Sequence, residues 1–108
     1  MLKHFYSFIV ETDTLFMEID SLEISDSEKV HLKSLAESHI HHSVLDTILS
    51  ELNIEDKKAF LEHLESKNAD KIWRFLHDKV DGVEEKIKQA AVEIKRELHR
   101  DLREAKES

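Results

Sequence analysis

Histidine is the residue type in this chain that could bind a metal ion or take up a proton near neutral pH. The chain has 108 residues, and eight of them are histidines. One predicted helix carries four of them: His31, His39, His41 and His42. His39 and His42 are three residues apart and share a helix face, where two imidazoles can coordinate one metal ion. Glu28 and His31 form a Glu-x-x-His pair, which is half of a bundle di-iron motif. A di-iron site needs a second such pair, and the sequence has none.

Two other interpretations fit the stretch 38–43, which holds three of these histidines. In the first, which we favour, it is the partly exposed middle of a helix, and the imidazoles fill space between apolar ends. In the second, neighbouring histidines with pKa values near 6.5 gain charge together in mild acid. We therefore predict no cofactor, and we keep as the alternative a metal- or pH-responsive binding protein that uses His39, His42 and His31.

The residue patterns of catalytic sites do not occur in this sequence. It has no cysteine and a single glycine, Gly82, so no glycine-rich loop can hold a phosphate group. The serines lie at predicted helix starts or within polar helices, not on a turn beside a base. Glu84 and Glu85 are successive on a helix and point apart, which suits two acids in a first turn. We predict that the protein is not an enzyme.

The net charge of -8 is unevenly distributed. Residues 1–67 carry 6 basic and 14 acidic side chains, whereas residues 68–108 carry 10 of each. An acidic front repels phosphate backbones, so we predict no nucleic-acid partner. Its simplest role is to keep the protein soluble.

The first ten residues are apolar but do not form a typical targeting signal. The run is short, ends at Glu11 and Asp13, and lacks a small-residue cleavage site. No window approaches the length of a transmembrane helix. A membrane-surface helix built on Phe5, Phe8 and Ile9 would lack the usual basic face. We predict a cytoplasmic protein with no membrane partner.

The elements that must position these side chains are helices. The chain has no proline and only one glycine, which argues against an all-β fold with its many tight turns. We predict one all-α domain over residues 1–108, a compact bundle of five or six helices. The apolar positions between Leu2 and Ile19 fit a helix with a break at residues 11–14.

Helix starts and stops are marked in the rest of the chain. Ser25 and Glu28 form a capping box before a helix that runs to about Leu52. Asn53 and Asn68 can each cap a shorter helix. The Asp81-Gly82 pair is typical of a helix end, with glycine in the left-handed conformation.

One long helix is predicted over residues 83–106, with a single apolar stripe. The members of the stripe are Val83, Ile87, Ala90, Ala91, Ile94, Leu98, Leu102 and Ala105. Its 24 residues would be about 36 Å long, against a radius of gyration of about 13 Å for a globule of this size. The end of the helix can therefore project. Arg96, Arg100 and Arg103 alternate with glutamates, which favours a solvated face.

Residues 15–98 resemble the small all-helical domains of candidate-phyla-radiation bacteria. The likeness lies in Ile54–Leu61, in Lys71–Leu76 and in the charged run from Glu84 to Leu98. It implies a helical architecture in a bacterial protein. It carries over no functional residue, because no activity is known for that group.

We predict a small soluble interaction module that acts by helix-on-helix packing, with a protein partner or as a homo-oligomer. The residues expected at its contact surfaces are Phe5, Phe8, Ile94, Leu98, Leu102 and Ala105. Trp73 lies among apolar neighbours and is expected in the core rather than at an interface.

Overall fold

The computed structural model describes residues 4–107, with side chains as far as residue 104. This range is all-α and has no strand, as the sequence predicts. Its five helices are α1 (Asp13–Asp20), α2 (Asp26–Ser50), α3 (Ile54–Ser66), α4 (Ala69–Lys79) and α5 (Val83–Glu107).

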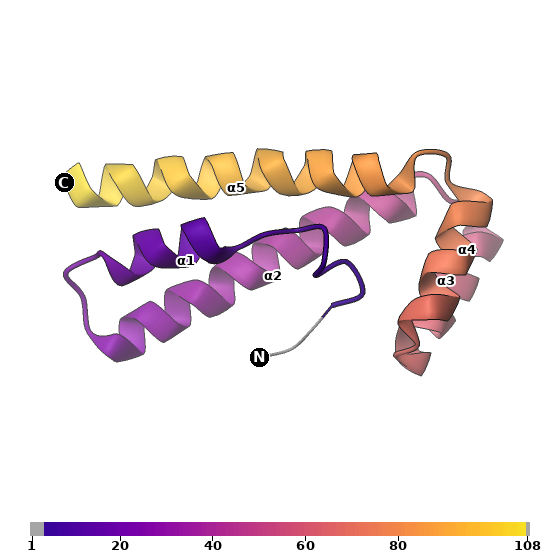
Figure 1. The fold of residues 1–108 in the computed structure, drawn as a ribbon, viewed down its shortest axis with the longest axis horizontal. Coiled ribbons are helices and arrows are strands. Elements are labelled where there is room, and N and C mark those ends of the chain that lie inside the picture. The colour runs from indigo at the N-terminus through magenta and orange to yellow at the C-terminus, as the bar shows by residue number, and fades with distance from the viewer. Residues whose placement is uncertain (1–3, 108) are drawn as a thin grey trace.

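Two long antiparallel helices, α2 and α5, set the length of the molecule (Figure 1). The short helix α1 packs against both of them, near the start of α2 and the end of α5. At the opposite end, α3 and α4 form a hairpin that crosses the long pair at a steep angle (Figure 1). The result is an elongated molecule of 46 × 22 × 22 Å.

Side-chain caps start three of the helices, as predicted. The Ser25 hydroxyl accepts the Glu28 N–H at 3.2 Å, as the predicted capping box requires. Its second bond differs from that motif, because the Ser25 hydroxyl, and not its backbone N–H, donates to the Glu28 carboxylate at 3.1 Å. The side chains of Asn53 and Asn68 each accept the N–H three residues further on, at 2.8 and 3.2 Å. These local bonds satisfy backbone donors that a helix leaves free at its first turn.

The C-terminal ends of the helices agree less well with the sequence-based prediction. Gly82 has a φ of 64°, in the predicted left-handed region, but α4 already ends at Lys79 and Val80 is extended. Lys67 ends α3 with a φ of 56°, which is unusual for a residue with a side chain. The sequence does not predict this turn, because lysine rarely adopts the left-handed conformation.

The buried apolar side chains form one continuous core. The longest run comes from α2, where Ala36, Ile40, Val44 and Ile48 recur every four residues. Phe60 is fully buried at the end where α3 and α4 cross the long helices. Contacts along this core hold the two long helices together.

The predicted stripe of α5 divides into two parts. Val83, Ile87 and Ala91 are buried, whereas Leu98 and Leu102 are half-buried against the core. Residues as far as Leu102 therefore lie against the body of the protein rather than beyond it. The reason is that α2 has 25 residues, as many as α5, so the body is longer than a globule of short helices.

The first described segment, residues 4–12, corrects one prediction. A helix was expected from Leu2 to Val10, but residues 5–9 form turns, and Leu2 lies outside the described residues. The Trp73 indole N–H donates to the Phe5 carbonyl at 2.9 Å, and the Tyr6 side chain is buried. A helix this short is marginal by itself, so these tertiary contacts determine the local backbone. The second part of the prediction holds, as α1.

Candidate functional site

An apolar groove of about 1080 Å³ opens where α1, the first half of α2 and the end of α5 meet. Its floor is formed by Leu15 and Ile19 of α1 and by Ala36 of α2. These three side chains are at most 4% exposed, so they belong to the core. The groove therefore has a fixed, apolar base.

Larger apolar side chains from three elements form the walls of the groove. They are Leu22 and Ile24 in the α1–α2 connection, Leu32 and Leu35 on α2, and Leu98 and Leu102 on α5. Leu35 is 44% exposed, and the other five are half-buried. A concave, mostly apolar surface with few polar groups is typical of a binding site.

Polar side chains lie on the outer parts of the groove lining. Three are carboxylates, from Glu23, Glu28 and Asp101, and two are imidazoles, from His31 and His39. All five residues are exposed. Among the described residues that line the groove there is no lysine and no arginine.

Polar contacts hold α1 in place beside the groove. Lys33 of α2 pairs with Asp20 at 2.7 Å. On α5, His99 pairs with Glu18, and the Lys95 ammonium group donates to the Glu11 carbonyl at 2.6 Å. Helix α1 is thus attached to both long helices, which keeps the floor residues in position.

Two of the predicted contact residues, Leu98 and Leu102, lie together in the groove. Ile94 packs half-buried against the core and does not line the groove. The side chain of Ala105 lies outside the described residues. Arg96 and Arg103 line a shallow hollow between α1 and α5, separate from the groove.

The other two predicted contact residues lie on the N-terminal segment, near α4. Phe5 is half-buried, with its ring edge-on to Trp73 at 5.5 Å between centroids. Phe8 makes a similar contact with Trp73 but remains 71% exposed. Trp73 itself is half-buried and packs against the core. This aromatic cluster attaches the segment to the α3–α4 hairpin.

The four histidines of α2 lie in different environments. His31 and His39 line the groove, whereas His42 is exposed and does not line it. His41 accepts or donates a hydrogen bond of 2.7 Å with the Tyr6 hydroxyl. Within the described part of the chain, no three histidine, cysteine or acidic side chains are grouped as metal ligands. His39 and His42 therefore do not form a shared site with a third ligand.

His41 connects α2 with the N-terminal segment. Its ring stacks on that of His4, with centroids 4.2 Å apart. Burial lowers the pKa of His41, and the nearby charges of His4 and His42 lower it further. The pKa of Tyr6 is raised, first by burial and then by the charge of Glu37. Both shifts favour the neutral forms of the hydrogen-bonded pair.

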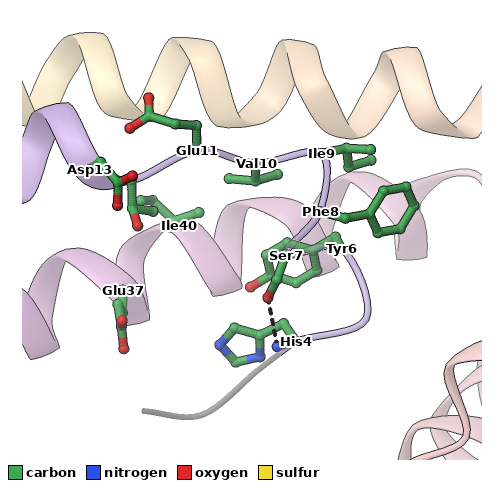
Figure 2. A pocket seen from close by; sticks show the side chains of 11 residues that line it. His4, Tyr6, Ser7, Phe8, Ile9, Val10, Glu11, Asp13, Glu37 and Ile40 are labelled. Atoms are coloured by element: carbon green, nitrogen blue, oxygen red, sulfur yellow. Dashed lines mark hydrogen bonds between the residues drawn. The ribbon is translucent and has the colours of Figure 1, made fainter.

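A second cavity, of about 460 Å³, lies between the N-terminal segment and α2 (Figure 2). Its lining includes the carboxylates of Glu11, Asp13 and Glu37. Thr14 donates its backbone N–H and its hydroxyl to Glu11, which lowers the pKa of that carboxyl. In the part of the chain that the structure describes, no buried side-chain polar atom lacks a partner. The cavity therefore presents no free buried group to a ligand.

Of the apolar side chains that form the groove walls, only Leu98 and Leu102 were predicted as contact residues. Leu22 and Ile24, in the α1–α2 connection, and Leu35, on α2, are not among the predicted contact residues. The convergence of this connection with α5 depends on the antiparallel packing of α2 and α5, which periodicity does not reveal.

Comparison with protein-family models, with curated proteins and with solved structures finds no match to this chain. The resemblance to small all-helical bacterial domains stays a prediction. No helix within residues 4–107 has the length and apolar character needed to cross a membrane.

Proposed function

We propose that this protein is a small interaction module that binds an amphipathic helix of another protein in the groove between α2 and α5. The supporting observation is the groove itself, with a buried floor, leucine walls and a polar outer lining. A helix that lays its apolar face in such a groove places side chains at i, i+3, i+4 and i+7 against it.

The exposed part of the walls supplies the driving force for this binding. Leu35 in particular has 44% of its surface exposed, and the apolar residues beside it are only half-buried. Burial of apolar surface contributes roughly 25 cal/mol for each Å² removed from water. An apolar helix face would complete the burial of these side chains without any rearrangement of the core.

The test is a selection from a displayed library of helical peptides whose apolar face and flanking positions vary. Peptides are selected on the wild type alone, and the affinity of each enriched peptide is then measured for the wild type, for Leu35→Asp and for Val30→Asp. A bound helix would remove the aspartate at position 35 from water, and desolvation of a charge is costly. We therefore expect Leu35→Asp to weaken binding at least about 30-fold. Val30→Asp is the matched control, because Val30 is also exposed on α2 but does not line the groove.

Two outcomes would contradict this proposal. One is that no helical peptide is enriched, or that the enriched peptides bind Leu35→Asp as well as Val30→Asp. The other is a homodimer whose light-scattering mass falls to that of a monomer in Leu35→Asp. That result would make a second copy of the chain the occupant of the groove.

We propose as a second function that the groove responds to pH. His31 and His39 both line it, together with the carboxylates of Glu23, Glu28 and Asp101. A bound helix removes the imidazoles from water, and desolvation disfavours their charged form. We therefore expect the affinity for a bound helix to be lower in mild acid than at neutral pH.

The pH response has its own test. Peptide affinity is measured at about pH 7.5 and about pH 5.5, on either side of the usual imidazole pKa. We expect weaker binding at the lower pH in the wild type, and no such change when His31→Gln and His39→Gln are combined. His42→Gln is the control, because His42 does not line the groove. Equal wild-type affinity at both values would remove the second proposal.

A further inference from the structure

We infer that the groove selects helices whose apolar face is flanked on both sides by lysine or arginine. This inference rests on the proposed helix-binding function and specifies the chemistry of the partner. It follows from the signs and positions of the charged side chains that line the groove.

The carboxylates come from different walls of the groove. Glu23 lies in the α1–α2 connection, Glu28 in the first turn of α2, and Asp101 on α5. A helix that lies between α2 and α5 therefore has a carboxylate on each side of its apolar face. Neither wall offers a lysine or arginine among the described lining residues. An acidic partner would meet repulsion on both sides.

Basic side chains line a different surface of the protein, close to the acidic groove. Lys95, Arg96 and Arg103 line the hollow between α1 and α5, together with Glu18 and His99. The groove and this hollow thus have opposite charge although both border α1 and α5. The acidic lining is a property of the groove, and not only a reflection of the net charge.

The three carboxylates are exposed to solvent, and this limits how much each can contribute to the binding of a basic partner. Each of the three residues is exposed, so each contact with a lysine or arginine should contribute little by itself and should weaken with salt. Opposite charges on both sides of a bound helix also fix its register and raise its association rate. Selectivity for a basic flank should therefore be strongest at low ionic strength.

The experiment uses one groove-binding peptide from the selection, resynthesised with its flanking positions all lysine, all glutamine or all glutamate. Dissociation constants are measured by fluorescence anisotropy at about 0.02 M and about 0.3 M salt. We expect the lysine form to bind about tenfold more tightly than the glutamate form at low salt, with glutamine between them. The difference should shrink at high salt.

The variant that tests the inference combines Glu23→Gln, Glu28→Gln and Asp101→Asn. Glutamine at position 28 keeps a side-chain oxygen that can accept the Ser25 hydroxyl, and its backbone N–H can still bond to Ser25. In this triple variant the lysine and glutamate peptides should bind almost equally, while the glutamine peptide should bind as it does to the wild type.

A matched control removes the same three negative charges elsewhere. Glu62→Gln, Glu65→Gln and Asp78→Asn change exposed residues on α3 and α4, away from the groove. The preference for lysine should persist in this control. If it disappears there too, or if the wild type binds all three peptides equally, the inference is overturned while helix binding stands. If no form of the peptide binds, the proposed function is overturned and the inference with it.

Discussion

The two ends of the α2–α5 pair differ in how completely their apolar stripes are covered. At the end where α3 and α4 cross, Phe60, Leu76 and Ile87 are fully buried. At the other end, α1 covers only part of the same stripes, and Leu35 and Leu98 remain partly accessible. The covering element decides the difference, because the apolar spacing continues along both helices.

This comparison indicates a division between stability and binding. A hairpin of 13 and 11 residues can close the crossing end, whereas α1 has only 8 residues. Side chains at the closed end should therefore contribute most to the free energy of unfolding. Those at the groove end should contribute more to binding.

The largest effect is expected for Phe60→Ala, which removes a fully buried aromatic ring from the closed end. Loss of burial and the resulting cavity should lower the free energy of unfolding by about 3–5 kcal/mol. Leu35→Ala, at the groove end, should lower it by less than about 1 kcal/mol, because Leu35 is already 44% exposed. Urea unfolding followed by circular dichroism measures both. Equal losses would contradict the division between the two ends.

A smaller loss of stability is expected when Leu98→Asp and Leu102→Asp are combined. Both leucines are half-buried, so the pair should cost about 2–3 kcal/mol in all. The helical circular dichroism signal should persist while peptide binding is lost. The milder pair Leu98→Ala and Leu102→Ala should fold and bind weakly. If both double variants unfold at room temperature, these leucines belong to the core and the groove is not a separate site.

Acid should weaken the attachment of the N-terminal segment to α2. The pKa of folded His41 lies below its ordinary value of 6.5, because of burial and the nearby charges of His4 and His42. As the pH falls below about 6.5, the unfolded state binds more protons at this site than the folded state, so stability falls. Urea unfolding at about pH 7.5 and about pH 5.5 measures this loss. His41→Gln should reduce the loss, whereas His42→Gln, on an exposed neighbour, should reduce it less.

The smallest effect concerns the start of α2, beside the groove. Ser25→Ala removes the side-chain cap on the Glu28 N–H and should lower the free energy of unfolding by about 1 kcal/mol. Ser25→Gly should cost only a few tenths of a kcal/mol by comparison. Thermal unfolding of the wild type, Ser25→Ala and Ser25→Gly measures the order of their stabilities. Equal stability of Ser25→Ala and the wild type would show that the Ser25 side-chain cap contributes nothing.

Local signals predicted the helices well, since Ser25, Asn53 and Asn68 mark three helix starts by their own hydrogen bonds. They failed for residues 4–10, where the Phe5 carbonyl is held by Trp73, 68 residues away. They also found only part of the groove. Leu98 was predicted as a contact residue. Leu22 lines the same groove, but it can be assigned to the groove only when the α1–α2 connection is placed beside α5.

The most direct test of the helix-binding groove is a fluorescence titration with a single label. The chain has no cysteine, so Leu35→Cys and Val30→Cys each accept one environment-sensitive dye on α2, inside and outside the groove. Addition of the selected helical peptide should shift the emission of the dye at position 35 to the blue and leave position 30 unchanged. Equal shifts at both positions, or no shift at position 35, would contradict the assignment of the groove as the binding site.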